Sequence, residues 1–277
     1  MHKKVLVTGA NGMLGQDLCP ILEKNGYDVI RTDVQTLDIT NPDMVETVLQ
    51  KETPDIVIHC AAYTNVDKAE EDLATARKIN ANGTENIAKT CGKIGATLVY
   101  ISTDYVFAGN GTKPYEPTDK TAPLNNYGLT KWEGEEAVRK YCKKHYITRT
   151  SWLYGIHGKN FVETMISLAD RPEVKVVDDQ VGCPTWTVEL SNGIIKLLGE
   201  QAPFGTYHVC GSGKTSWYGF AKKIFELSGL KVNLNPCTTE EFPRPAKRPS
   251  YSVMDNHGIC RNWEDALADY IKLRKEV

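Results

Sequence analysis

The sequence predicts an α/β fold, a doubly wound parallel sheet with a smaller C-terminal lobe. Apolar strand-like runs alternate with helical patterns throughout residues 1–150, and this alternation is typical of sheets covered by helices on both faces. The connections between the runs are long enough to join parallel strands. A glycine-rich turn separates the first strand from the first helix, which is the third observation that favours this fold class.

Short apolar runs mark the expected strands, and apolar residues spaced three or four apart mark the expected helices. The run at 55–59 is continuously apolar, as in parallel strands buried on both faces. The helix expected at 42–51 begins with a proline, which is favoured at the first helical position. The other expected strands are 4–8, 28–33, 97–102 and 146–150, and the other expected helices are a helix from Leu14 to the Asn25–Gly26 turn, 73–94 and 126–141.

The pattern becomes irregular after residue 150, and this irregularity marks the smaller lobe. Residues 175–186 predict a strand and a loop instead of a strand–helix unit. A helical face in LSNGIIKLL and the strand-like run 206–210 are expected to return to the first sheet. The lobe, which includes a helix near 217–227 and a proline-rich loop, is expected to close over the carboxyl ends of the strands. The resulting division assigns 1–150 and 187–210 to the larger domain, and 151–186 and 211–277 to the lobe.

The composition is that of an ordinary globular chain of 277 residues, 25% of them charged, with a formal net charge of −2. Without a basic excess or a polybasic run, no nucleic-acid or membrane partner is expected. The N-terminus has no signal-peptide pattern and no apolar run reaches ~18 residues, so a cytoplasmic location is expected. The eight cysteines are scattered singly, and the six histidines show no ligand spacing. We expect unpaired thiols and no metal site, and the sequence leaves open whether a divalent ion assists assembly.

Gly9, Gly12 and Gly15 form a GxxGxxG pattern between the first strand and the first helix. Glycine there allows a tight turn and close approach of the backbone to a pyrophosphate, and the helix N-terminus favours the negative phosphates. The alternative is a glycine-rich turn without a ligand. Asp33, at the end of the second strand, is expected to bind the adenosine ribose, which favours NADH, while Arg31 nearby keeps NADPH open. The larger domain is therefore expected to be a dinucleotide-binding domain of the Rossmann type that binds NADH or NADPH.

Tyr127 and Lys131 lie four residues apart on an expected helix, so they share one helix face. A tyrosine with a pKa of about 10 is a weak acid–base group at neutral pH. The ammonium of Lys131 is expected to shift that pKa toward neutrality. The YxxxK pattern is a common coincidence by itself, but here it follows the fourth expected strand and its STDYVFAG segment.

The glycine spacing and the order of STDYVFAG and YxxxK resemble the extended branch of the short-chain dehydrogenase/reductase family. Within that branch, several segments together resemble the dTDP-4-dehydrorhamnose reductases: VTGANGMLG, HCAAYTNVDKAE, YISTDYVFAG, YGLTKWEGE, RTSWLYG, DQVGCPT and RPSYSVMD. They span nearly the full chain in the expected order. The resemblance implies that Thr103, Tyr127 and Lys131 form the catalytic group.

The same resemblance implies the remaining site residues. The implied cofactor-binding residues are Gly9, Asn11, Gly12, Met13, Leu14, Gly15, Asp33, Asp38, Ile39, Ala61, Ala62, Tyr63, Tyr127 and Lys131. The implied substrate-binding residues are Thr103, Asp104, Trp152, Gln180, Thr185 and Arg248. The guanidinium of Arg248 also suits a diphosphate. For three residues a structural role is the alternative: a turn for Asp38, the core for Trp152 and solvent for Arg248. His59 is expected to be a core or loop histidine.

The resemblance implies an oxidoreductase that uses NADH or NADPH to reduce the 4-keto group of dTDP-4-dehydro-L-rhamnose to dTDP-L-rhamnose, in dTDP-rhamnose and polysaccharide biosynthesis. Another nucleotide-sugar reductase or epimerase of the same family is the nearest alternative. A dehydratase is disfavoured because Tyr105 follows Asp104 where a glutamate is expected. The third alternative is a non-catalytic regulatory subunit that keeps the fold. The sequence leaves open whether the chain forms a homodimer.

Overall fold

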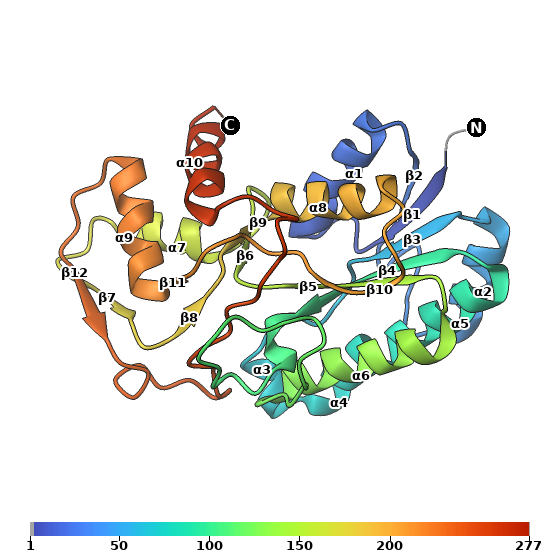
Figure 1. The fold of residues 1–277 in the computed structure, drawn as a ribbon, viewed down its shortest axis with the longest axis horizontal. Helices are drawn as coiled ribbons and strands as arrows, with labels where there is room; N and C mark the ends of the chain where they lie inside the picture. Colours follow the sequence, from blue (N-terminus) through green and yellow to red (C-terminus); the bar gives the residue numbers. More distant parts are fainter. Residues whose placement is uncertain (1–2, 277) are drawn as a thin grey trace.

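A six-stranded parallel sheet forms the centre of the larger domain in this computed structural model, which describes residues 3–276 (Figure 1). The strand order is β10-β5-β4-β3-β1-β2, and every neighbouring pair is parallel. The order reverses between β1 and β3, which is where doubly wound sheets open a crevice for ligands. The predicted fold class is confirmed, including the return of residues 206–210 to the sheet. The strands are β1 (Lys4–Thr8), β2 (Asp28–Arg31), β3 (Ile56–His59), β4 (Thr97–Thr103), β5 (His145–Thr150) and β10 (Gly205–His208).

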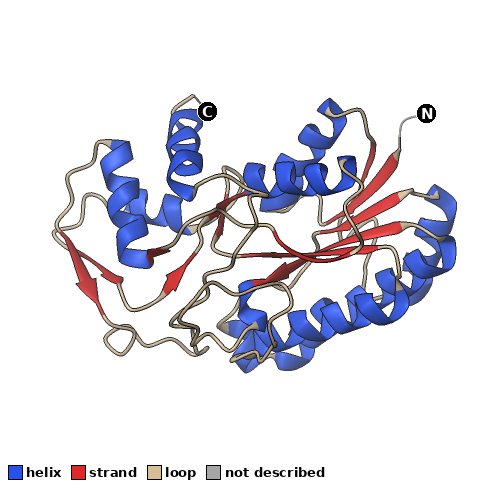
Figure 2. Ribbon diagram, in the orientation of Figure 1, coloured by secondary structure: helices blue, strands red, loops and turns tan. Residues whose placement is uncertain are grey.

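Helices cover both faces of this sheet (Figure 2). Alternate residues of a strand point to opposite faces, so Val5 and Val7 pack with one set of helices and Leu6 with the other. The first set is α1 (Met13–Lys24) and α8 (Thr187–Gly199), which contact each other. The second set is α2 (Pro42–Glu52), α5 (Thr84–Ile94) and α6 (Asn126–Tyr141).

The helix expected at 73–94 is interrupted. The chain instead forms α3 (Lys68–Glu71), α4 (Leu73–Arg77), the π-helix η1 (Lys78–Gly83) and then α5. Inside η1, the Asn80 side chain accepts a hydrogen bond from the Tyr63 amide at 2.8 Å and donates to the Tyr63 carbonyl at 3.0 Å. This contact with the segment that follows β3 accompanies the wider turn, and π-turns are frequent beside functional sites.

A second aromatic-rich core lies at the left of Figure 1. Tyr154, Phe220, Trp263 and Tyr270 are buried there and pack ring against ring. We propose that this core is the body of the smaller lobe expected at 151–186 and 211–277. Short strand pairs and three helices surround it; α7, α10, β6, β11 and β12 have no counterpart among the elements expected from the sequence. The elements are β6 (Leu153–Tyr154), α7 (Phe161–Ser167), β7 (Val174–Val177), β8 (Val181–Gly182), β9 (Thr185–Trp186), β11 (Thr215–Ser216), α9 (Trp217–Ser228), β12 (Leu234–Cys237) and α10 (Trp263–Arg274).

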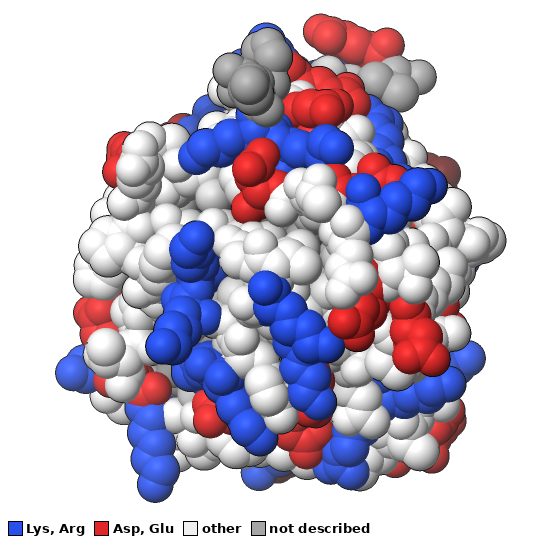
Figure 3. Space-filling model, turned by 90° about the vertical axis from the view of Figure 1, so that its right-hand side faces the viewer, with Lys and Arg blue, Asp and Glu red and all other residues white. Residues whose placement is uncertain are grey.

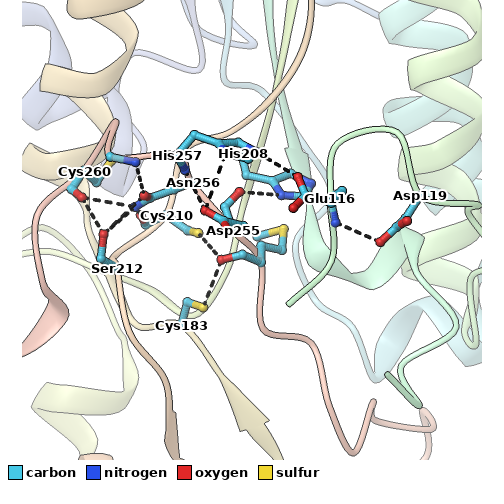
Figure 4. Close-up of polar contacts among 12 residues, drawn as sticks. Glu116, Asp119, Cys183, His208, Cys210, Ser212, Asp255, Asn256, His257 and Cys260 are labelled. Atoms are coloured by element: carbon cyan, nitrogen blue, oxygen red, sulfur yellow. Dashed lines mark hydrogen bonds and ion pairs between the residues drawn. The ribbon is translucent and has the colours of Figure 1, made fainter. Parts of the chain in front are cut away.

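The segment before α10 is fastened to the end of β10 through buried polar contacts (Figure 4). The Asn256 amide donates to the carbonyl oxygens of Cys210 and Cys260. The thiols of Cys183 and Cys210 both donate to the Met254 carbonyl. On the other side, the His257 ring contacts the Glu116 carboxylate at 2.7 Å, which joins this segment to the loop that follows β4.

All eight cysteines are free thiols, as expected, and all except the half-buried Cys60 are buried. Within residues 3–276, no helix combines the length and the apolar character needed to cross a bilayer. The same residues contain no group of three or more His, Cys, Asp or Glu side chains arranged to hold a metal ion. Basic and acidic side chains are mixed on the face shown in Figure 3.

A buried ion pair holds α6 against the sheet. Glu135 on α6 is fully buried, and its carboxylate accepts two hydrogen bonds from Arg149 on β5, at 2.8 and 2.7 Å. It also accepts hydrogen bonds from Ser102 on β4 and from Arg139. These donors hold the pKa of the Glu135 carboxyl below its usual range despite burial. The Glu135 carboxylate is therefore charged inside the protein, and both of its oxygens accept hydrogen bonds, a state that depends on both partners.

We expect Glu135→Gln to lower the free energy of unfolding by about 3–5 kcal/mol, because it leaves the Arg149 charge buried without its partner. The neighbouring Glu136, whose side chain is 54% exposed and which also binds Arg139, is the matched control. Glu136→Gln should change the same free energy by less than about 1 kcal/mol. Urea unfolding followed by circular dichroism measures both, and equal effects of the two changes would contradict this view of the ion pair.

Candidate active site at the carboxyl edge of the sheet

A cavity of about 1140 Å³ lies at the carboxyl ends of the central strands. Its wall combines the turn after β1, the segments after β2, β3 and β4, the start of α6 and the lobe around Trp152. It therefore lies where β1 and β3 reverse the strand order, the place at which open α/β sheets bind ligands. The volume suits a large ligand or two ligands side by side.

The glycine turn after β1 is closely packed. Gly9 has φ +64°, and a Cβ atom there would lie 2.8 Å from the Ala61 amide nitrogen. A Cβ atom on Gly15 would lie 2.6 Å from the Gly9 carbonyl oxygen, so only glycine lets α1 start this close to the strand. Gly12 caps α1 without a side-chain hydrogen bond, and the first turn of α1 carries no acidic residue. The helix therefore offers unshielded N–H groups to an anion in the cavity. Asn11, Met13 and Leu14 line the cavity beside these glycines.

Asp33 lines the cavity at the end of β2. Its carboxylate accepts hydrogen bonds from the amides of Asn11 at 3.1 Å and Val34 at 2.7 Å, which fixes it beside the glycine turn. The guanidinium of Arg31 pairs with Glu23 at 2.8 Å instead. Arg31 is therefore engaged on α1 in this structure.

Asp38 and Ile39 also line the cavity. The Asp38 carboxylate accepts hydrogen bonds from the Thr40 amide and hydroxyl, and these bonds lower its pKa. Asp38 therefore has the turn role considered as the alternative, and it also lines the cavity. The Ile39 side chain packs against η1, where a Cβ atom on Gly83 would lie 2.8 Å from it.

The segment after β3 contributes Ala61 and Ala62 to the cavity wall. Tyr63 is not among the lining residues, and its backbone amide donates a hydrogen bond to the Asn80 side chain. His59 is a core residue as expected: it is 1% exposed and its ring nitrogens contact the hydroxyls of Thr8 and Thr84. Burial lowers the pKa of His59 to about 3, so the ring is neutral.

Thr103, Tyr127 and Lys131 meet in the cavity wall. Thr103 is the last residue of β4, while Tyr127 and Lys131 are on the first two turns of α6. The Asn125 side chain caps α6 by accepting from the Gly128 amide at 2.8 Å. A Cβ atom on Gly128 would lie 2.2 Å from the Tyr105 carbonyl oxygen, so this glycine lets the helix approach the end of β4.

The sequence-based expectation for the Tyr127 pKa is wrong for this structure. Burial, and then the Asp104 carboxylate, raise the pKa of Tyr127 to about 12, and a hydrogen bond with Thr103 offsets part of that rise. Burial also lowers the pKa of Lys131 to about 7, although Glu135 opposes this. The Lys131 ammonium lies 4.2 Å from the centre of the Tyr100 ring, a cation–π contact. Tyr127 is thus a protonated phenol at neutral pH, the form that donates a proton.

Asp104 is buried beside Thr103, and one of its two carboxylate oxygens, Oδ2, has no hydrogen-bond partner among residues 3–276. The other, Oδ1, accepts the Thr103 hydroxyl hydrogen at 3.0 Å. Burial raises the pKa of Asp104 to about 6. While this carboxylate is charged, it engages the hydrogen that Thr103 would need in order to donate to another oxygen.

Of the other expected substrate residues, Trp152 lines the cavity and the rest do not. Trp152 has φ +48°, a strained value for a large side chain. Its ring stacks on Trp217 with centroids 3.5 Å apart. Thr185 is fully buried behind it and donates its amide hydrogen to the Trp152 carbonyl at 3.3 Å. Thr185 therefore holds the backbone of Trp152 and is not part of the cavity wall.

The side chains of Gln180 and Arg248 contact other residues of the protein and do not line the cavity. The Gln180 amide donates to the Thr239 hydroxyl at 3.0 Å, and the residue is 8% exposed. Arg248 is ion-paired with Asp67 at 3.0 Å and donates to the Ala246 carbonyl, which fastens the proline-rich loop to the segment before α3. The solvated role considered as the alternative for Arg248 is wrong, because its side chain is only 16% exposed.

The cavity-lining residues that sequence reasoning missed include Lys78, Lys159 and Trp217. Lys78 begins the π-helix, which the helical pattern did not reveal. Trp217 was assigned only to a lobe helix. Lys159 follows Gly158 in a short loop. A basic residue beside a glycine was the one feature of the sequence that could have indicated a place in the cavity wall.

Comparison with known proteins identifies the chain. Residues 3–275 match the protein family described as "RmlD substrate binding domain". This chain belongs to the dTDP-4-dehydrorhamnose reductase family. It is similar to a solved dTDP-4-dehydrorhamnose reductase from Clostridium acetobutylicum, with 48% identity, a TM-score of 0.96, and coverage of 98% of this chain and 99% of that one.

Two further relatives carry useful information. The family member from Bacillus anthracis, solved in complex with NADP, is 45% identical, has a TM-score of 0.95 and covers 99% of this chain and 100% of its own. The spore coat polysaccharide biosynthesis protein SpsK of Bacillus subtilis is 44% identical, and the match covers 99% of both chains. The resemblance inferred from the motifs is thus confirmed over the full length.

The Thr103–Asp104 contact predicts a pH effect on keto-sugar reduction. Below pH 6, Asp104 is protonated and releases the Thr103 hydrogen for a substrate oxygen. We therefore expect kcat/KM to rise as the pH falls from about 7 to about 5, and Asp104→Asn to flatten the profile over that interval, because an amide does not titrate. An unchanged profile in Asp104→Asn would assign the titration to another group.

Proposed function

We propose that this protein reduces the 4-keto group of dTDP-4-dehydro-L-rhamnose to give dTDP-L-rhamnose, with NADH or NADPH as the reductant. The observation that carries this proposal is the convergence of Thr103, Tyr127 and Lys131 beside the glycine turn, in a member of the dTDP-4-dehydrorhamnose reductase family. The relative solved with NADP supports the choice of a nicotinamide cofactor.

The residues of the cavity fit a dinucleotide. The start of α1, which has no side-chain cap hydrogen bond, and the close-packed glycines suit a pyrophosphate. Asp33 is held where it would accept hydrogen bonds from the adenosine ribose. When bound, the nicotinamide supplies a hydride to the carbonyl carbon. Because Arg31 is paired with Glu23, its use for a 2′-phosphate requires that pair to open.

Three side chains are proposed to act on the substrate carbonyl. Tyr127, a neutral phenol at working pH, donates its proton to the oxygen as negative charge develops. Thr103 donates a hydrogen bond to the same oxygen once Asp104 is protonated. Lys131 is proposed to bind the nicotinamide ribose and, when charged, to favour the phenolate left after proton transfer.

The substrate is proposed to lie between this group and the lobe, with Asp104 and Trp152 against the sugar. Thr185 would act through Trp152, whose backbone it holds. Arg248 would reach the dTDP diphosphate only after leaving Asp67, and Gln180 only after leaving Thr239. Tyr63 would contact the cofactor only if its segment shifted toward the cavity.

We also propose a cytoplasmic location and a homodimer. Free thiols in all eight cysteines fit a reducing compartment. Sedimentation of the purified chain, with and without Mg²⁺, tests the oligomeric state: a mass of about twice 30.9 kDa supports the dimer, and a mass near 30.9 kDa opposes it.

The proposal is tested by following the absorbance of NADH, and then of NADPH, in the presence of dTDP-4-dehydro-L-rhamnose. Stoichiometric oxidation of either cofactor supports a reductase. A related epimerase would convert the sugar without net oxidation. A chain that binds NADPH and turns over no keto-sugar would instead be a regulatory subunit that keeps the fold.

We expect Tyr127→Phe to lower kcat by at least about 100-fold and to leave the Kd for NADPH within about threefold, because the change removes one proton donor. Tyr141→Phe, at the far end of the same helix, is the matched control and should keep wild-type kcat. Stopped-flow or steady-state absorbance gives kcat, and fluorescence titration gives the Kd. Retained turnover in Tyr127→Phe would remove this residue from the mechanism.

A further inference from the structure

A short loop of the smaller lobe crosses over the start of α1. The loop, residues 155–160, connects β6 to α7. At its centre Gly158 has φ +95°, and a Cβ atom there would lie 4.0 Å from Met13, the first residue of α1. The lobe thus comes within contact distance of the turn proposed to hold a pyrophosphate.

Asp17 on α1 anchors the loop to the larger domain. The His157 ring lies 3.5 Å from one of its carboxylate oxygens, and the Thr187 hydroxyl donates to the other. Gly155 packs closely on the same carboxylate, since a Cβ atom there would lie 3.1 Å from it. At the other end of the loop, the Asn160 amide donates to the Gly155 carbonyl at 2.7 Å, and its oxygen caps α7. Both ends are therefore fixed.

Lys159 is the basic residue of this fixed loop, and it is exposed and lines the cavity. Its ammonium makes no ion pair and no hydrogen bond with the protein among residues 3–276. The other two lysines that line the cavity, Lys78 and Lys131, come from the larger domain. Lys131 is engaged with Tyr100, and the positive charge of Lys78 acts on Asp38, whose pKa it helps to lower.

Apart from Lys159, the charged side chains within residues 3–276 that line the cavity offer no free positive charge to a diphosphate at the start of α1. Three carboxylates, those of Asp33, Asp38 and Asp104, line the same wall. At the start of α1 the protein offers backbone N–H groups and no charged side chain of its own. A diphosphate there carries two negative charges, and an ammonium within reach adds a charge-assisted hydrogen bond.

We propose that Lys159 is a ligand of the dinucleotide pyrophosphate and reaches it from the smaller lobe. The inference rests on the proposed use of NADH or NADPH and adds a residue to that site. The pyrophosphate then lies between the N-terminus of α1 and Lys159 of the loop, so that both parts of the molecule bind the cofactor. Lys159 takes no part in proton or hydride transfer.

The test compares Lys159→Gln with Lys222→Gln, which removes an exposed lysine from α9 in the same lobe and away from the cavity. Kd values are measured by isothermal titration for NADPH, ADP, adenosine and dTDP. Lys159→Gln should weaken NADPH and ADP about tenfold and leave adenosine unchanged, because adenosine lacks the diphosphate. It should also reduce the salt dependence of the NADPH Kd. Lys222→Gln should match the wild type for all four ligands.

Other results overturn the inference. A loss of affinity confined to dTDP would show that Lys159 binds the substrate diphosphate. Wild-type Kd values for all four ligands would show that Lys159 binds neither the cofactor pyrophosphate nor the substrate diphosphate. Equal losses for ADP and adenosine would show a distorted adenosine site instead of a missing phosphate contact. Wild-type protein that binds NADPH but reduces no dTDP-keto-sugar would contradict the proposed function and leave the Lys159 result standing. Wild-type protein that binds no dinucleotide would overturn both.

Discussion

The buried ion pair between Glu135 and Arg149 is the interaction on which the candidate site depends. Glu135 lies one turn beyond Lys131 on α6, and its carboxylate binds Arg149 of β5 and Ser102 of β4. Arg149 also donates to the Pro117 carbonyl and lies over the Phe107 ring, so the loop after β4 is held by the same contact. One network therefore fixes the helix that carries Tyr127 and Lys131 to the strand that ends at Thr103.

The site also needs space at the carboxyl edge of the sheet, and close packing of backbones provides it. Gly9, Gly15 and Gly128 each lie where a Cβ atom would come within 2.8 Å or less of a backbone atom. Gly9 brings the turn after β1 up to the segment after β3, Gly15 brings α1 up to that turn, and Gly128 brings α6 up to the end of β4. The lobe closes the opposite side through Trp152, whose strained backbone accepts a hydrogen bond from the Thr185 amide and whose ring stacks on Trp217. The cavity is thus a product of both parts of the chain.

The larger domain could be predicted from the sequence because its signals are local. The helix at 126–141 has the bounds predicted from the sequence, and in the structure Asn125 caps it. The π-helix could not be predicted, because it is accompanied by the Asn80–Tyr63 contact, which joins residues 17 positions apart and lies outside the helical pattern. The same limit applies to Arg248, whose partner Asp67 lies 181 residues earlier in the chain, and to the Tyr127 pKa, which is set by burial more than by a neighbouring charge. The helices α7 and α10 pack into a core of residues from several segments, and no single segment of the sequence reveals it.

The central claim is that this cavity transfers a hydride to a sugar carbonyl, with Tyr127 as the acid. The most direct measurement uses NADPH carrying deuterium at C4 of the nicotinamide ring on the transferred face, with dTDP-4-dehydro-L-rhamnose as the substrate and mass spectrometry of the product. The account predicts one deuterium at C4 of the sugar and one NADP⁺ for each dTDP-L-rhamnose formed. Product without deuterium from either labelled face of the cofactor, or sugar conversion without NADP⁺, would contradict it.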